Sequence, residues 1–222
     1  MTENSVVIVF IKSPEKGRVK TRLAKDVGEN AAVALYQCFV MDVLDMVRST
    51  SWALRVYYHP ETRSRHIRSW LGDKLDFFPQ TGTTLGDKMK NALAQTFDAG
   101  YERAVLIGSD LPDLPSGIIE IAFNGLKRKD AVLGPSPDGG YYLIGFTARG
   151  FSPGIFNEIP WGTNRVLDLT LNNFADHRIL PLCLPVWRDI DTKEDLQTLG
   201  LDPASGPALH TTGYLQKKRL IF

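Results

Sequence analysis

The fold is decided by the stretch Ser5-Val6-Val7-Ile8-Val9-Phe10-Ile11, an unbroken apolar run that predicts a strand buried on both faces. After a basic loop, residues 29–48 place apolar side chains every three or four positions, which predicts a helix with one core-facing stripe. The same alternation then repeats. Further strands are expected at Leu54 to Tyr58, Leu75 to Phe78, Ala104 to Ile107, Ala131 to Leu133 and Tyr141 to Phe146, and further helices at Leu85 to Phe97 and Ile118 to Leu126.

This alternation favours a three-layer α/β/α fold around a mostly parallel sheet with right-handed crossovers. Past residue 131 the alternation loosens and Gly139-Gly140 indicate a hairpin, so the sheet is expected to be mixed there. A length of 222 residues with 43% hydrophobic composition suits one domain, which we place over residues 1–200. A linker and tail over 201–222 follow, and the tail is expected to dock on the core because Leu220, Ile221 and Phe222 would otherwise be exposed together.

Composition narrows the classes of function. A formal net charge of +1 provides no overall field for nucleic acid or an anionic membrane, so any anion site must be local. Cys38 and Cys183 have no CxxC spacing, which predicts buried free thiols in a reducing compartment. A basic segment with a signal-type apolar run is missing from the start, and no run approaches about 18 apolar residues, so we expect a cytoplasmic protein. The oligomeric state stays open, with a homo-oligomer among the alternatives.

Candidate ligand sites are sought after the apolar runs, because open parallel sheets bind ligands beyond the carboxyl ends of their strands. The first candidate is the loop from Lys12 to Ala24, whose dense lysines and arginines suit a di- or triphosphate. It has neither P-loop nor GxGxxG spacing. A solvated basic loop is the alternative interpretation.

The second candidate is Asp110, which a strand delivers to the ligand edge of the sheet, where its oxygens suit Mg²⁺ or Mn²⁺. Asp113 either adds a second oxygen source or caps the next helix. The third candidate is the Asp138-Gly139-Gly140-Tyr141 segment, which a hairpin turn also explains without chemistry. Further on, Asp191 either reaches the same metal or caps a short helix containing Glu194 and Asp195.

Five motifs occur in one order between about residues 5 and 199. They are Phe10-x-Lys12-x-Pro14-x-x-Gly17-x-Val19-Lys20-Thr21-Arg22-Leu23, Gly108-Ser109-Asp110-x-Pro112-x-Leu114, Gly134-Pro135-x-x-Asp138-Gly139-Gly140-Tyr141-Tyr142-Leu143-Ile144-Gly145, Trp161-x-Thr163 and Asp189-x-Asp191-Thr192-x-x-Asp195-Leu196. As a set they resemble the GT-A-like nucleotide-diphospho-sugar transferases, described as selenodomain- or radical-SAM-associated glycosyltransferase-like proteins. Lys20-Thr21-Arg22-Leu23 is more distantly similar to phospholactate guanylyltransferases, and the overall plan to molybdenum-cofactor guanylyltransferases.

The resemblance implies a site for the nucleotide and a metal ion. Lys12, Lys20, Thr21 and Arg22 would contact the phosphates. Asp110 would be the first ligand of Mg²⁺ or Mn²⁺ and Asp191 the second. Lys88 would add a phosphate contact, although Gly82-Thr83-Thr84-Leu85-Gly86 before it departs from the Gly-Gly-Asp-Leu-Gly pattern that family members often carry.

The resemblance also implies an acceptor side formed by the hairpin. Asp138 would act as general base toward an acceptor hydroxyl, beside Gly139, Gly140 and Tyr141. Trp161 either stacks on a sugar ring or packs within the protein.

The reaction that the resemblance favours is glycosyl transfer from a nucleotide-diphospho-sugar to a small-molecule acceptor. Two alternatives stay open. One is guanylyl or cytidylyl transfer from a nucleoside triphosphate to a phosphorylated small molecule, with release of pyrophosphate. The other is a nucleotide-binding module without catalysis, because a shared fold does not decide the chemistry.

Overall fold

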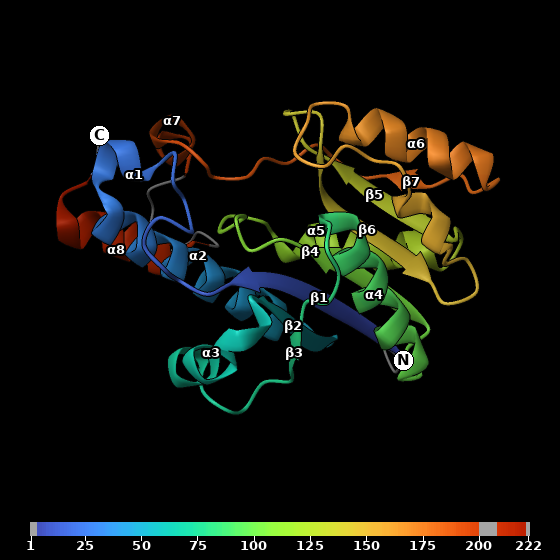
Figure 1. Ribbon diagram of the computed structural model, residues 1–222, viewed down its shortest axis with the longest axis horizontal. Coiled ribbons are helices and arrows are strands. Elements are labelled where there is room, and N and C mark those ends of the chain that lie inside the picture. The colour runs from blue at the N-terminus through green and yellow to red at the C-terminus, as the bar shows by residue number, and fades with distance from the viewer. Residues whose placement is uncertain (1–3, 200–207, 221–222) are drawn as a thin grey trace.

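The computed structural model describes residues 4–199 and 208–220 and forms a seven-stranded sheet between two layers of helices (Figure 1). The strands lie in the order β3-β2-β1-β4-β6-β5-β7, and only β6 runs antiparallel to its neighbours. Their bounds are β1 (Ser5–Lys12), β2 (Ala53–His59), β3 (Phe77–Pro79), β4 (Arg103–Ile107), β5 (Ala131–Pro135), β6 (Tyr141–Thr147) and β7 (Leu182–Cys183). The predicted mostly parallel, mixed sheet is confirmed.

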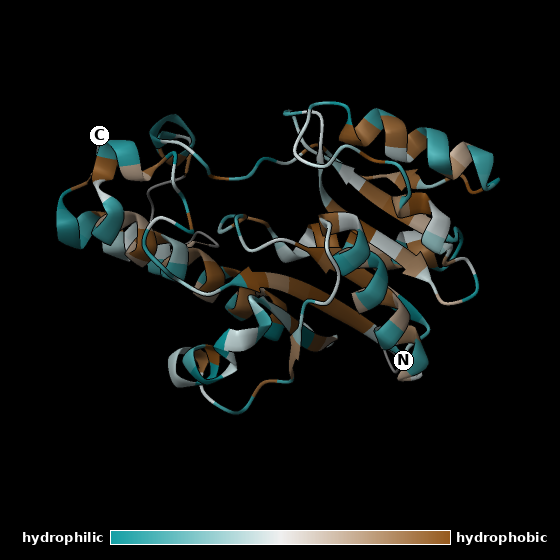
Figure 2. Cartoon of the chain, in the orientation of Figure 1, coloured by the Kyte–Doolittle hydropathy of each residue, from teal (hydrophilic) through white to brown (hydrophobic). Residues whose placement is uncertain are grey.

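The helices cover both faces of the sheet. They are α1 (Ala24–Val27), α2 (Glu29–Arg48), α3 (Ser64–Leu71), α4 (Leu85–Asp98), α5 (Ser116–Leu126), α6 (Val166–Asp176), α7 (Lys193–Gln197) and α8 (Leu209–Lys218), with 3-10 turns at Glu61–Arg63 and Pro153–Phe156. Successive β1 side chains point to opposite faces. Val7, Val9 and Ile11 therefore join the core under α2, α3 and α5, whereas Val6, Ile8 and Phe10 join the core under α4 and α6. The brown strands between teal outer helix faces in Figure 2 show the same layering.

Two elements that the sequence analysis did not identify are short. Helix α3 buries Ile67, with Trp70 and Leu71 partly buried against the same core, and β7 has two residues. Because β7 is the edge strand, Cys183 is exposed, so its predicted burial is wrong. Cys38 is half-buried, and burial together with nearby Asp42 raises its pKa to about 11. Both thiols are free.

The C-terminal helix α8 lies along α2 (Figure 1). Asp42 of α2 is 2% exposed, and its carboxylate accepts the backbone N–H groups of His210 and Thr211 at the start of α8. Below this contact is a third core cluster, which contains Leu23, Ile190, Leu196 and Leu215 with Leu220 packed against it. The tail from 208 to 220 therefore joins the loop after β1 to the segment around Ile190. The predicted linker, and Ile221 and Phe222 of the predicted docking contact, lie outside the described residues.

Helix α2 is the one described helix long and apolar enough to cross a membrane by length and composition. However, 56% of its apolar window is buried within the fold, as in the core helix of a globular protein.

Candidate nucleotide and metal site

The carboxyl ends of β1 and β4 lie side by side at the point where the sheet changes direction. From β1 the chain passes to β2 on one side, whereas β4 lies on the other side. This is where open α/β sheets form a ligand crevice. Tyr36 of α2 ties the two strand ends together, because its hydroxyl accepts the Lys12 N–H at 2.6 Å and lies 3.2 Å from Ser109 Oγ. Burial raises the Tyr36 pKa, and the Asp110 charge raises it further, so this hydroxyl stays protonated.

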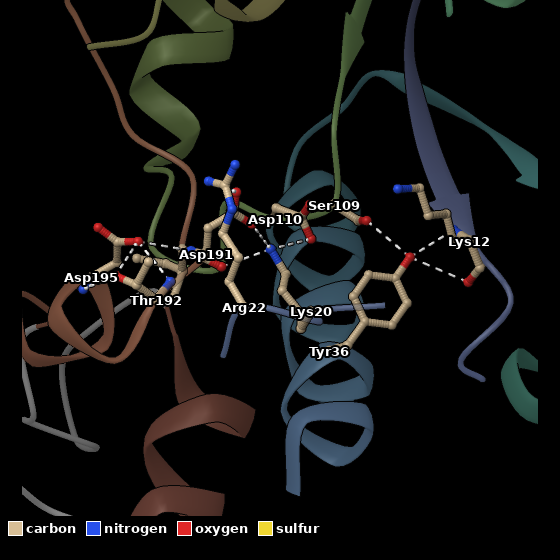
Figure 3. A network of polar contacts seen from close by, with 10 residues as sticks. Lys12, Lys20, Arg22, Tyr36, Ser109, Asp110, Asp191, Thr192 and Asp195 are labelled. Atoms are coloured by element: carbon tan, nitrogen blue, oxygen red, sulfur yellow. Dashed lines mark hydrogen bonds and ion pairs between the residues drawn. The ribbon is translucent and has the colours of Figure 1, made fainter. Parts of the chain in front are cut away.

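Lys20 lies at the centre of the site (Figure 3). Its Nζ is 2.9 Å from Asp110 Oδ1 and 2.9 Å from Asp191 Oδ1, and it donates a hydrogen bond of 2.7 Å to the Ile190 carbonyl. The side chain is only 2% exposed, and its backbone adopts the left-handed conformation (φ 47°) that side chains rarely take. Burial lowers the Lys20 pKa, but the two carboxylates outweigh burial and raise it. In this structure the ammonium therefore contacts carboxylates, although Lys20 also contributes to the wall of the cleft.

Of the other predicted phosphate contacts, Lys12, Thr21 and Arg22 line a common hollow, whereas Lys88 does not. Arg22 is 74% exposed, with Nη1 3.8 Å from Asp191 Oδ2. Together with Lys12 and Thr21 it lines a hollow of about 230 Å³ that also reaches Asp110, which we call the phosphate hollow. Lys88 does not line this hollow, and its Nζ lies 3.5 Å from His59 Nδ1.

Asp189 is a carboxylate of the site that the sequence reasoning did not select. Burial, together with the negative charges of Asp110, Asp191 and Asp138, raises its pKa to about 7 against the opposing charge of Lys20. The spacing Asp189-x-Asp191 could have indicated that Asp189 lies at the site beside Asp191, because residues two apart in an extended segment point to the same side. The hydrogen bond from the Ile190 N–H to the Asp110 carbonyl brings this segment to the end of β4.

The helix starts near the site have their own caps. Thr192 and Asp195 form a reciprocal capping box at α7, and Thr84 and Asp87 form another at α4. Asp191 therefore does not cap α7 with its side chain. Asp113 does not cap α5 either, because its carboxylate accepts from Trp187 Nε1 and Arg188 Nη2.

The carboxylates fit a divalent cation by their chemistry. Asp110 Oδ1 is buried and, apart from its ion contact with Lys20, has no hydrogen-bond partner. The two Asp191 oxygens already face Lys20 and Arg22, so Asp110 and Asp189 are the less committed pair. Oxygen ligands with surplus negative charge are what Mg²⁺ and Mn²⁺ prefer. Within residues 4–199 and 208–220, however, no three His, Cys, Asp or Glu side chains converge closely enough to enclose an ion.

An apolar slot of about 220 Å³ adjoins this charged cluster and reaches Asp110 and Lys12. Phe10, Met89 and Leu106 contribute to its walls. Gln80 lines it too, and its amide N–H₂ donates to the carbonyls of Ile11 and Tyr57 at 3.1 and 2.9 Å. The amide is therefore held in one orientation beside the slot. A flat apolar ring with polar edges is the kind of group that such a slot accommodates.

The hairpin side of the cleft is held by local contacts. Asp138 is exposed, and its Oδ1 accepts the Gly140 N–H at 3.0 Å. Gly139 has φ 84°, and a Cβ there would lie 2.1 Å from the Asn164 carbonyl, so only glycine fits. Trp161 packs directly over Gly86, and its ring contacts the Tyr141 ring edge to face, with 6.4 Å between the ring centroids. This supports packing as the role of Trp161.

Comparisons with known proteins agree with this architecture. Residues 43–163 match a family described as uncharacterised proteins conserved in bacteria (DUF2064). The chain is 37% identical to a protein from Desulfovibrio desulfuricans G20 that is provisionally assigned as a nucleotide-diphospho-sugar transferase. The match has a TM-score of 0.91 and covers 98% of this chain and 96% of the other. No protein of curated function matches the sequence.

More distant structures share the fold alone. A cytidylyltransferase from Leptospira borgpetersenii is 12% identical with a TM-score of 0.57, covering 98% of this chain and 96% of that one. The manganese complex of Rv0371c from Mycobacterium tuberculosis is 16% identical with a TM-score of 0.53, covering 86% of this chain and 95% of that one.

Proposed function

We propose that this chain, which belongs to the DUF2064 family of bacterial proteins and has the nucleotide-diphospho-sugar transferase fold, is a transferase that uses a nucleotide-activated donor and a divalent metal ion. The reaction that we propose is glycosyl transfer from a nucleotide-diphospho-sugar to a small-molecule acceptor. The function assigned to the Desulfovibrio protein, at 37% identity over nearly the whole chain, supports this choice.

The observation that carries the proposal is the juxtaposition of three features at the ends of β1 and β4. These are an apolar slot sized for a nucleobase, a hollow lined by cations, and a group of carboxylates with surplus negative charge. Lys12 and Asp110 line both the slot and the hollow, so a nucleotide with its base in the slot would extend its phosphates toward Arg22.

The cations would have two roles, binding the donor phosphates and positioning the carboxylates. Arg22, Lys12 and Thr21 lie in the open hollow, where they can bind phosphate oxygens and stabilise charge on the leaving nucleoside diphosphate. Lys20, buried between Asp110 and Asp191, would hold both carboxylates in place. Its role in this proposal is therefore to position the carboxylates.

The metal would be held by Asp110, with Asp189 or Asp191 as the second ligand. A divalent ion held there would supply positive charge that stabilises the leaving nucleoside diphosphate. Asp189 is the better second candidate, because both Asp191 oxygens face cations.

The hairpin would receive the acceptor. The hydroxyl oxygen of the acceptor would form a bond to the anomeric carbon of the donor sugar. The bond from that carbon to the phosphate oxygen would break, and the nucleoside diphosphate would leave. Asp138 is exposed and near enough to Asp189 to influence its charge, so it could accept the hydroxyl proton.

Nucleotidyl transfer is the second candidate, because the exposed cations around the phosphate hollow also suit a triphosphate. The products separate the two reactions. Glycosyl transfer releases a nucleoside diphosphate from a nucleotide sugar, whereas nucleotidyl transfer releases pyrophosphate from a nucleoside triphosphate.

Calorimetric titration of UDP, GDP, CDP and ADP, with and without manganese, tests the proposal. We expect one base to bind best, and we expect this binding to require both the metal and Asp110. Asp110→Ala should abolish metal-dependent binding while the fold stays intact. Asp98→Ala is a matched control, because Asp98 is an exposed aspartate at the end of α4. Binding that is unchanged in Asp110→Ala, or absent for every nucleotide at millimolar concentration, would refute the proposed site.

A further inference from the structure

A second polar pocket, of about 480 Å³, opens beside the phosphate hollow. We call this second pocket the flank pocket. Ser13, Glu15, His59, Thr62 and Arg63 line it, and Lys12 and Arg18 form walls common to it and to the phosphate hollow. Its residues come from the loop after β1 and from the turn between β2 and α3. None of the residues contributed by that turn belongs to the motifs that define the nucleotide site.

The flank pocket carries uncompensated positive charge. Among the described residues, the side chains of Lys12 and Arg18 form no ion pair, and both are exposed. Lys88 adds a third cation 3.5 Å from His59 Nδ1. Burial lowers the His59 pKa, and the charges of Lys88 and Lys12 lower it further, against the opposing charge of Glu61. The lowered pKa indicates that His59 lies in a positive electrostatic potential inside the pocket.

The single carboxylate in the pocket wall is already neutralised. Arg63 Nε lies 2.7 Å from Glu15 Oε1, and Arg63 Nη2 donates to Glu15 Oε2 at 3.2 Å. Glu15 Oε1 is buried by this pairing. Arg63 is 51% exposed, and within residues 4–199 and 208–220 its Nη1 forms no hydrogen bond, so a guanidinium edge remains for a ligand.

We propose that the flank pocket binds a phosphate group, through Arg63, Arg18 and Lys12, in addition to the phosphates held in the phosphate hollow. The pocket shares two cationic walls with that hollow, Lys12 and Arg18, which form no ion pair among the described residues, and Arg63 adds a guanidinium edge. Convergent cationic donors of this kind suit a phosphate. The phosphate has two sources. It is the third phosphate of a nucleoside triphosphate, or the phosphate of a second substrate. The choice of source rests on the proposed function, whereas phosphate binding itself does not.

Calorimetry with inorganic phosphate, inorganic pyrophosphate and matched nucleoside di- and triphosphates tests the inference. Arg63→Gln should weaken binding of inorganic phosphate or of the triphosphate roughly ten-fold or more, because it removes charge-assisted hydrogen bonds. Arg65→Gln is the matched control, since Arg65 is an exposed arginine two residues away that does not line the pocket. It should change the same affinities by less than about two-fold.

A variant with the opposite expected sign guards against general loss of structure. Glu15→Gln removes the negative charge from the pocket wall and releases Arg63, so phosphate should bind several-fold more tightly. The Glu15→Gln/Arg63→Gln double variant should lose that gain. A phosphate-induced shift of the His59 ring signals in an NMR titration, absent from Arg63→Gln, gives an independent readout.

The outcomes separate the sources. Loss confined to the triphosphate, with the diphosphate unchanged, assigns the pocket to the third phosphate. Loss confined to inorganic phosphate assigns it to a second substrate. If Arg63→Gln and Arg65→Gln behave alike with every ligand while Arg22→Gln weakens all of them, anions bind only in the phosphate hollow and the inference is wrong. If no nucleotide binds but phosphate binding still depends on Arg63, the proposed function fails and the inference stands.

Discussion

The two sides of the cleft are held in different ways. On the phosphate side, the almost fully buried Lys20 joins Asp110 and Asp191, which lie 90 and 171 positions further along the chain. On the hairpin side, Asp138 is exposed and accepts a hydrogen bond from Gly140, only two residues away. The first arrangement depends on the tertiary structure, and the second on a local turn.

This difference separates stability from chemistry. An ion cluster around a buried lysine that joins distant parts of the same chain is costly to break. The remaining carboxylates would lose their partner where water solvates them poorly. A local turn on the surface can lose its carboxylate with little effect on the fold. Substitutions on the phosphate side should therefore change the free energy of unfolding, whereas Asp138 should be replaceable without such a change.

The largest effect on stability is expected from Lys20→Met, which keeps an unbranched apolar side chain but removes the ammonium, which lies 5.5 Å from the centroid of the Phe39 ring. We expect a loss of about 3 kcal/mol in the free energy of unfolding, at the lower end for broken buried pairs because Asp110 and Asp191 are 35% and 45% exposed. Urea unfolding measures it. Lys16→Met, at an exposed lysine in the same loop, is the control. Equal stability of the two variants would show that the cluster contributes little.

A large effect on turnover but not on stability is expected from Asp138→Asn. The amide oxygen can still accept the Gly140 N–H, so unfolding should change by less than about 0.5 kcal/mol. Turnover of the nucleotide sugar should fall by roughly 100-fold, the lower limit for loss of a general base. A variant with normal turnover would remove Asp138 from the catalytic assignment.

A smaller effect is expected from Arg22→Gln, because Arg22 is 74% exposed. Binding of the nucleoside diphosphate should weaken by about 1.5 kcal/mol, and binding of the nucleoside alone by much less. Lys25→Gln serves as the control, since Lys25 is an exposed cation three positions on and outside the hollow. Equal losses for nucleoside and diphosphate would place Arg22 away from the phosphates.

The last prediction concerns the pH dependence of stability without metal. The Asp189 pKa is raised to about 7 in the folded chain, so the folded state holds this proton more tightly than the unfolded state does. The resulting stability is present below about pH 4 and is lost as the pH rises through about 7. Asp189→Asn should therefore reduce the fall in unfolding free energy between about pH 5 and pH 8, measured in a chelating buffer. An identical pH profile in wild type and variant would contradict the shift.

Most of the fold could be predicted from local pattern. The unbroken apolar run of β1 and the spacing along α2 identified a buried strand and its covering helix, because burial on two faces or on one stripe leaves its period in the sequence. Helix α3 has eight residues, and its apolar spacing rests on Ile67, Trp70 and Leu71 alone, which is too short a pattern to separate a helix from a loop. Strand β7 has only two residues.

The candidate site divides in the same way. The order of residue types after the apolar runs of β1 and β4 was enough to place Asp110, Arg22 and the basic loop at the ligand edge of the sheet. Which of these charges contact one another follows from the packing of the whole chain. This packing buried Lys20 between two carboxylates and brought Asp189 beside them, because contacts over 170 positions depend on how the helices and the tail pack. Charge type is local chemistry, whereas pairing and burial are properties of the whole fold.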